Sequence, residues 1–508
     1  MRSIKSMRNM LISILANVIV AMVGFITQKI FIGTLGDEFL GVNGLFSNII
    51  SMLAIAELGV GTAIVYNMYK PIANQDDETI KSLLRFYKRC YQVIAIIVLL
   101  IGLLIIPFLP FIVGEVTISD NLICIYSLFL IDVVLSYLLI YKRSILDANQ
   151  GNYICQLIHV IYVIVLNAVQ IALLLVFKNY YYYLGSKVLF RLLENYTISK
   201  FVDLKYPFVK DRNVLPLNGD IKKDIICKVK AIVFHKIGGF AILGSDNILI
   251  SMLINVTSVG YYSNYKMIIG AVQNLFLQAF TSLNASVGNL LVTDKEKSYE
   301  IYKKLEFLNF GLSTFTSSCL LIIMECFIEI WLGPKYILSS FVLIMLVANY
   351  YLQTMRAAMG TFKEAAGIFY EDRFIPFVEL ICNIIFSILF SGIFGLAGIF
   401  MGTVISNFVL HFYSFPKYCY KNIFAMPIRR YFQLIFKYFA SSILICGIAW
   451  EGWKYCAQHI YSVYLQFFIS TIYAMIIPKL ILFVIFRKTE EFKFYKSFIC
   501  NIVGKLKN

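Results

Sequence analysis

Apolar residues gather in long runs along this chain, and short polar segments separate the runs. A helix needs about 20 apolar residues to cross a hydrocarbon layer, and runs of that length recur about fourteen times. The first run is too long, and too poor in small residues at its end, for a cleaved signal peptide. The pattern therefore predicts an all-α polytopic membrane protein. The expected spans lie near residues 9–32, 41–68, 91–113, 121–141, 153–177, 181–199, 231–254, 260–290, 308–332, 338–359, 374–393, 396–416, 432–453 and 462–486.

The pattern in the first half of the chain returns in the second half. Residues 29–114 overlay residues 248–333 at a constant offset, including a charged linker at 74–88 and again at 293–307. The matched pairs are Gly41 with Gly260 and Gly114 with Gly333 at an offset of 219, and Gly151 with Gly367 and Asn167 with Asn383 at an offset of 216. Such doubling is typical of transporters whose binding site lies at the centre of the molecule.

Composition and charge narrow the class further. The 508 residues are 60% hydrophobic, and the mean hydropathy is +0.77, which excludes an ordinary soluble protein. Lys and Arg are concentrated at the N-terminus and in every second loop of the predicted topology. Arg143 and Arg356 are assigned to these loops. Because cytoplasmic loops retain positive charge, both termini are expected in the cytoplasm. This asymmetry accounts for most of the net charge of +16, so no nucleic-acid partner is expected.

Enzyme motifs are missing from the sequence. There is no P-loop, no GxSxG and no HExxH, and no predicted cytoplasmic segment is long enough for a nucleotide-binding domain. The eleven Cys residues are scattered without a CxxC pair or a His at metal-ligand spacing. We therefore expect no catalytic residues, no metal and no cofactor. A membrane-embedded glycosyltransferase is disfavoured because the predicted outer loops are too short to bind sugar.

Cations inside the apolar spans are the first candidates for a site, because ionisable groups within a membrane usually face a water-filled interior. Lys29, Arg191, Lys236 and Lys266 are such residues. Each also has a structural interpretation. Lys29 and Lys236 lie near span ends and can reach the interface, and the i, i+3 spacing of Arg191 and Glu194 favours a local ion pair. For Lys266, a role in a cavity is favoured.

Tyr262 belongs to a group of tyrosines just before Lys266, with Tyr261 and Tyr265. Aromatic rings at this place suit a sugar-stacking platform and an interfacial belt equally well. The sequence leaves both interpretations open.

Four acidic residues are also enclosed by apolar sequence. A buried carboxylate pairs with a cation, takes up a proton or binds a coupling ion. Asp246 and Lys266 lie on consecutive spans, so a structural ion pair between them is as plausible as separate transport roles. His159, His235 and His411 are candidate proton carriers, although hydrogen-bonded packing is favoured for each. The acidic candidates are Glu57, Asp132, Asp246 and Glu379.

Three segments carry a resemblance to a known family. They are Leu35 to Ala73, Ser245 to Lys266 (SDNILISMLINVTSVGYYSNYK) and Ile328 to Tyr336 (IEIWLGPKY). In this order they resemble the bacterial polysaccharide flippases of the multidrug, oligosaccharidyl-lipid and polysaccharide exporter superfamily. The resemblance implies two six-helix lobes, expected at 1–215 and 216–428, that face each other across a central cavity. Two further helices and a cytoplasmic tail are expected at 429–508.

The resemblance also implies a cargo. This is a polyprenyl-diphosphate-linked oligosaccharide that alternating access carries from the inner to the outer leaflet of a bacterial plasma membrane. The lipid-linked sugars would serve a capsule or another surface polysaccharide, with glycosyltransferases and a polymerase as expected partners. Moving a bare sugar diphosphate through hydrocarbon would cost many kcal/mol, and a polar cationic cavity removes that barrier.

Two other functions stay open. A multidrug or cation antiporter of the same superfamily would present net acidic cavity groups with few opposing cations. A non-transporting membrane scaffold would need no cavity, and its intramembrane charges would be satisfied in pairs.

Overall fold

The structure is a computed structural model of the whole chain. It describes residues 2–497 except 54–59, 119, 150, 212–213, 218, 220–221, 224, 227–243, 282 and 369–370. Every regular element among these residues is helical. The chain divides into two compact units, Met1–Tyr265 and Lys266–Asn508, and each is described by itself. The lobe limits expected from the sequence stay a prediction.

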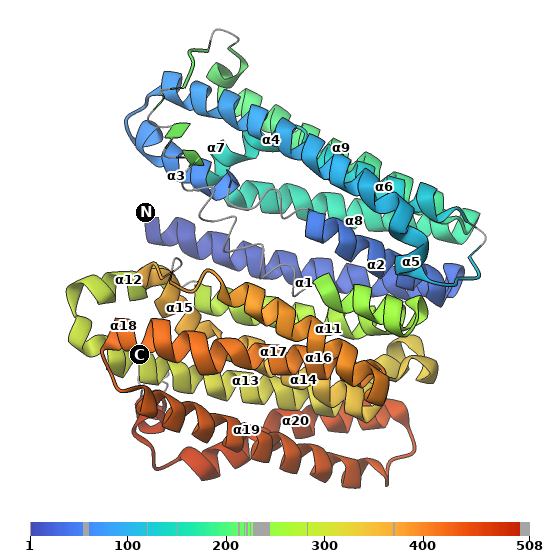
Figure 1. The fold of residues 1–508 in the computed structure, drawn as a ribbon, viewed down its shortest axis with the longest axis vertical. Coiled ribbons are helices and arrows are strands. Elements are labelled where there is room, and N and C mark those ends of the chain that lie inside the picture. The colour runs from blue at the N-terminus through green and yellow to red at the C-terminus, as the bar shows by residue number, and fades with distance from the viewer. Residues whose placement is uncertain are drawn as a thin grey trace, which may run out of the picture. The chain divides into compact units, whose positions relative to one another are not determined.

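The first unit is built from long helices that are interrupted near their ends (Figure 1). A helical segment at 244–253 follows α9, and α11 (Val256–Thr281) begins in this unit and continues into the second. The other elements are α1 (Arg2–Leu35), α2 (Asp37–Leu53), α3 (Val60–Ala73), α4 (Asp77–Ile105), η2 (Ile106–Phe108), α5 (Leu109–Val113), α6 (Leu122–Ser136), η3 (Ile140–Lys142), α7 (Arg143–Ala148), α8 (Asn152–Phe177), α9 (Tyr180–Lys205) and η4 (Pro207–Lys210).

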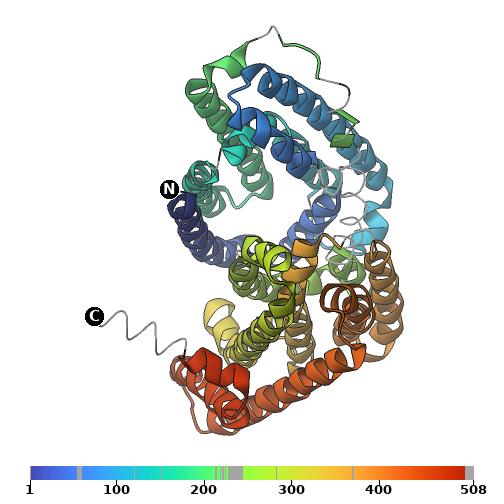
Figure 2. The ribbon, with the colours of Figure 1, turned by 90° about the vertical axis from the view of Figure 1, so that its left-hand side faces the viewer.

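The second unit continues in the same manner, and α19 and α20 form one edge of it (Figures 1 and 2). Both helices pack on α13 and on each other. The elements are α12 (Asn284–Thr293), α13 (Lys295–Leu332), η5 (Pro334–Tyr336), α14 (Ser340–Met355), α15 (Ala357–Ala366), α16 (Ile375–Phe394), α17 (Leu396–Val409), the π-helix η6 (Leu410–Tyr420), α18 (Lys421–Phe424), α19 (Ile428–Ala457) and α20 (Val463–Phe486).

The membrane prediction is confirmed. Nine helical stretches within the described residues are long and apolar enough to cross a bilayer. Where the structure describes them, the predicted apolar runs fall on helical segments; the second run is described except for residues 54–59, and the seventh only from residue 244. The chain is an all-α, multi-pass membrane protein.

The internal repeat is visible in how helices pack within each unit. In the first unit α4 packs on α6, α6 on α9, α8 on α9, and α3 on α7. In the second unit α13 packs on α14, α14 on α17, α16 on α17, and α12 on α15. These are the same pairings at corresponding places in the chain. The two six-helix parts therefore share one packing scheme, and α19 and α20 follow the second of them.

Helix ends repeat as well. Asp76 caps α4 by accepting the N–H of Thr79, and Asp294 caps α13 by accepting the N–H of Lys297. The side-chain hydrogen bonds from Thr79 and Lys297 hold the pKa of both aspartates below the usual range.

Matched glycines occupy matched positions. Gly114 follows α5 with a φ of 72°, and Gly333 follows α13 with a φ of 106°, a backbone region that favours glycine. Gly41 of α2 and Gly260 of α11 lie against each other, since a Cβ added at Gly260 would stand 3.0 Å from the backbone nitrogen of Gly41. The absence of side chains there allows the two helices to approach closely.

Glycines also set the close contact between α16 and α17. A Cβ added at Gly402 would overlap the backbone nitrogen of Ser387, whereas a Cβ added at Gly392 of α16 meets nothing within 4 Å. We expect Gly402→Ala to lower the free energy of unfolding by about 1–3 kcal/mol, because overpacking forces the helices apart. Gly392→Ala is the matched control and should leave the unfolding temperature in detergent unchanged. Equal effects of the two substitutions would contradict this account.

Candidate functional site

The fourth predicted span is broken in the first unit, and the break positions a site. Helix α6 ends at Ser136, Leu139 takes a left-handed conformation with a φ of 67°, and α7 starts at Arg143. The break frees backbone carbonyls that the hydrocarbon could not satisfy. Asn195 of α9 donates from Nδ2 to the carbonyl oxygens of Ser136 (3.1 Å) and Leu138 (3.3 Å). This side chain therefore stabilises the break from which α7 carries Arg143 towards the interior of the unit.

Asn195 gives a direct test of the break. Asn195→Leu should lower the free energy of unfolding by about 1–3 kcal/mol, because two backbone carbonyls at the helix break lose their donor. Asn17→Leu on α1 is the control, since Asn17 lines the same cavity but makes no hydrogen bond within the described structure. Thermal unfolding in detergent compares the two variants. If Asn195→Leu unfolds like Asn17→Leu, the amide does not hold the break.

Three charged side chains meet between α6 and α9. The carboxylate of Asp132, a residue only 7% exposed, lies 3.5 Å from Nζ of Lys187 and 3.5 Å from Nε of Arg191. Nζ of Lys187 also stands 4.9 Å from the ring centroid of Phe129. Lys187 and Arg191 are one helical turn apart on α9, so both point to the same neighbour. One carboxylate thus faces two cations.

A second carboxylate stands beside this group. Oε1 of Glu194 lies 2.9 Å from Nδ1 of His159 on α8, a distance that fits donation from Nδ1–H to the carboxylate. Glu194 is buried, whereas the His159 side chain is 39% exposed. Both side chains line the same open space, and His159 is the more exposed of the two.

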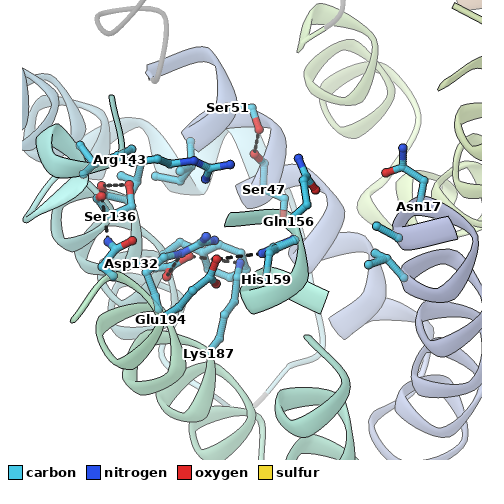
Figure 3. Close-up of a pocket in the computed structure, with 18 residues that line it drawn as sticks. Asn17, Ser47, Ser51, Asp132, Ser136, Arg143, Gln156, His159, Lys187 and Glu194 are labelled. Atoms are coloured by element: carbon cyan, nitrogen blue, oxygen red, sulfur yellow. Dashed lines mark hydrogen bonds and ion pairs between the residues drawn. The ribbon is translucent and has the colours of Figure 1, made fainter. Parts of the chain in front are cut away.

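These side chains line a cavity of about 580 Å³ within the first unit (Figure 3). That volume lies within the usual range of small-molecule pockets. Arg143 extends into the same space and makes no ion pair with any described residue. Three cations and two carboxylates give the lining a formal charge of +1 with His159 neutral. The polar lining consists of Asn17, Ser47, Ser51, Asp132, Ser136, Arg143, Gln156, His159, Lys187, Arg191, Glu194 and Asn195.

The corresponding helices of the second unit hold a different arrangement. Arg356, which stands between α14 and α15, donates to the carboxylate of Glu379 on α16 and to the side-chain oxygen of Asn407 on α17. Asn407 donates in turn to Asn349 of α14 at 2.8 Å. One cation here faces one carboxylate, and Glu379 is 2% exposed. The cluster is a hydrogen-bonded network in which the one cation is matched by one carboxylate.

The predicted site residues are distributed as follows. Asp132 and Arg191 come together in the cavity, and the partner of Arg191 is Asp132 instead of Glu194 on its own helix. Glu379 meets Arg356 in the second unit. Lys29 is exposed on α1, Tyr262 and Asp246 are buried in the first unit, and Lys266 is half-buried where the second unit begins. Glu57, His235 and Lys236 lie outside the described residues.

Sequence reasoning missed three charged residues of these clusters. Lys187 lies four residues before Arg191 in the same predicted span, so the rule that selected Arg191 would also have selected Lys187. Arg143 and Arg356 were counted as loop cations. The structure corrects this assignment, because both stand at helix breaks and point inward to polar clusters.

Solved structures of other proteins share this fold. No protein-family model and no curated protein matches the sequence. Among solved structures the chain is similar to the lipid II flippase MurJ in an inward closed conformation, with a TM-score of 0.66 and 15% identity over 94% of this chain and 99% of that chain. The chain therefore shares its fold with that structure.

Two further structures agree with this relationship. An inward-facing multidrug resistance transporter of the MATE family, in the MOP superfamily, has a TM-score of 0.57 and 13% identity over 83% of this chain and 98% of that chain. A mutant of the Vibrio cholerae MATE transporter VcmN has a TM-score of 0.58 and 14% identity over 85% of this chain and 99% of that chain. The MOP-type fold expected from the resemblance is confirmed, and identities this low establish the fold alone.

Proposed function

We propose that this chain is a flippase that moves a polyprenyl-diphosphate-linked oligosaccharide from the inner to the outer leaflet by alternating access. The observation that carries the proposal is the charge of the cavity in the first unit, where Arg143 has no ion-pair partner in the described structure and two further cations share Asp132. The fold shared with a lipid II flippase supports it. The product would serve a capsule or another surface polysaccharide.

The cavity suits a sugar diphosphate chemically. Arg guanidinium groups bind phosphate oxygens through paired N–H donors, and Lys binds them as a point charge. Asn17 and Gln156 line the same space without hydrogen-bond partners in the described part of the chain, so their amides are available to sugar hydroxyls. An inside-negative membrane potential would favour export, by about 2.3 kcal/mol per negative charge and 100 mV.

The alternative functions fit this cavity less well. A pump for cationic drugs would need a net acidic lining, whereas this lining has a formal charge of +1. A scaffold would have its charges matched in close pairs, as the Arg356 and Glu379 pair is, whereas Arg143 makes no ion pair among the described residues and faces the cavity.

The proposal includes a cellular setting. The protein acts in a bacterial plasma membrane with both termini in the cytoplasm, between glycosyltransferases that load the lipid and a polymerase that consumes it. The two six-helix lobes at 1–215 and 216–428 open in turn. Lys29, Lys266 and Tyr262 are retained as candidate contacts for the cargo, and Glu57 and Asp246 as candidate sites for a coupling ion.

Arg143 provides the test. Purified protein in proteoliposomes should move a fluorescent polyprenyl-diphosphate-linked oligosaccharide out of reach of a membrane-impermeant quencher. Arg143→Ala should lower the rate about tenfold or more, and Arg143→Lys should retain part of it, because a charge-assisted contact with phosphate is lost in the first and kept in the second. Arg143 also interacts electrostatically with Asp147, one turn along α7, so protein abundance is measured for each variant and the rates are compared per molecule of folded protein.

Controls separate the candidate functions. Arg89→Ala removes an exposed cation outside the cavity and should leave the rate unchanged. Ethidium replaces the lipid in a parallel assay. Transport of ethidium but not of the lipid would establish the antiporter instead, and movement of neither would favour the scaffold.

A further inference from the structure

A groove runs along α19 in the second unit. Its walls come from α13, α14, α17 and α19, and its volume is about 500 Å³. Helix α19 packs on α13 and η6, and the groove lies between α19 and the helices α14 and α17. In Figures 1 and 2, α19 lies at the edge of this unit. The lining is almost entirely apolar and includes Leu321, Val347, Val404, Phe408 and Phe439.

Gly447 keeps the groove wide. It lines the groove from α19, and a Cβ added there would meet no atom within 4 Å. Most glycines inside a membrane helix allow another helix to approach closely. At Gly447 no other helix comes close, so the missing side chain leaves empty space along α19.

The length of the groove suits one leaflet of the bilayer. Its lining on α19 extends from Phe439 to Glu451, which is about 18 Å at about 1.5 Å per residue. Half of a hydrocarbon core is about 15 Å thick. A single acyl chain of one leaflet would therefore fill the groove, whereas a polyprenyl tail would extend well beyond it.

A polar pocket adjoins the end of the groove. Its volume is about 300 Å³, and it shares Leu321 and Trp450 with the groove. Glu325 and Glu329 line it from α13, one helical turn apart, and neither makes an ion pair among the residues that the structure describes. Repulsion between two such carboxylates favours a cation beside them.

One cation of the protein stands at this pocket. Lys454 is held on α19 itself, with its Nζ 3.5 Å from the ring centroid of Trp450 and 3.7 Å from Oε1 of Glu451. With Lys454, the two α13 carboxylates give the pocket a formal charge of −1. A group that carries a phosphate and an ammonium together would complement this arrangement.

We propose that the groove and the pocket together bind one phospholipid with an amine headgroup. The acyl chain lies along Gly447, the phosphate lies beside Lys454, and the ammonium donates hydrogen bonds to Glu325 and Glu329. A sugar diphosphate would be repelled by these two carboxylates, so the occupant is a lipid of the bilayer and not the cargo. The site is independent of the proposed transport function.

The test uses full-length protein and defined lipids. Native mass spectrometry would measure retention of phosphatidylethanolamine and of phosphatidylglycerol added to delipidated protein. The wild type should retain one phosphatidylethanolamine in preference to phosphatidylglycerol. Gly447→Phe should lose it, because the ring fills the groove without a clash. Leu444→Phe adds the same bulk on an exposed position of α19 and should retain the lipid.

A second variant tests the headgroup. Glu325→Gln with Glu329→Gln should still retain a lipid, but its preference for the amine headgroup should fall about tenfold. If Gly447→Phe retains the phospholipid as well as the wild type does, the groove is not the binding site. A wild-type preference for phosphatidylglycerol, or displacement of the phospholipid by undecaprenyl phosphate, would overturn the choice of occupant.

Discussion

Replacing Arg356 by alanine should destabilise the second unit by about 3–5 kcal/mol, the usual cost of removing one partner of a buried ion pair. Glu379 is 2% exposed and would lose its cation, and Asn407 would lose a donor. Three helices, α14, α16 and α17, meet at this network. We expect the unfolding temperature in detergent to fall well below that of the wild type.

A double variant separates the ion pair from the fold around it. Arg356→Met combined with Glu379→Gln removes both charges, and much of the lost stability should return because no charge is left buried alone. Arg429→Ala is the control, since Arg429 is exposed and makes no ion pair in the described structure. If the double variant is as unstable as Arg356→Ala, packing instead of charge explains the loss.

Sequence pattern predicted the helices well because a bilayer imposes one length and one composition on each crossing. The break at 137–139 was not predicted, and the run 121–141 was expected to be one helix. Neither Gly nor Pro marks this break, and Leu139 takes the left-handed conformation. Its stabilising group, Asn195, comes from another helix. A contact between helices that are far apart in the sequence cannot be predicted from the local sequence pattern.

The site was predicted only in part for the same reason. Asp132 and Arg191 were selected one by one because each is a charge within an apolar run. Their pairing depends on how α6 and α9 are rotated towards each other, which spacing along one helix does not reveal. Spacing along α9 pointed to Glu194, and Glu194 is bonded to His159 instead.

The two repeats differ in charge balance more than in packing. Polar clusters occur at corresponding helices, namely α6, α8 and α9 in the first unit and α14, α16 and α17 in the second. The first cluster has an excess cation and opens into a cavity, and the second matches one cation to one carboxylate. We therefore expect substitutions in the first cluster to alter transport and substitutions in the second to alter stability.

Lys187→Met should raise the apparent KM for the polyprenyl-diphosphate lipid about a hundredfold. Removing one cation lowers the formal charge of the cavity from +1 to 0. A unit charge at roughly 5 Å from a phosphate contributes about 3 kcal/mol at an effective dielectric constant of about 20. Asp132 keeps Arg191 at 3.5 Å, and the methionine side chain keeps an apolar contact with Phe129, so the unfolding temperature should change little.

Asp132→Asn changes the charge of the cavity in the opposite direction to Lys187→Met. It raises the formal charge of the cavity from +1 to +2 while the shape of the side chain is kept. If the summed charge attracts the diphosphate, the apparent KM should fall in Asp132→Asn and rise in Lys187→Met, with Lys187→Arg close to the wild type. Equal losses in Asp132→Asn and Lys187→Met would mean that the ion pair only holds α6 to α9, and the cavity would then not be the binding site for the diphosphate.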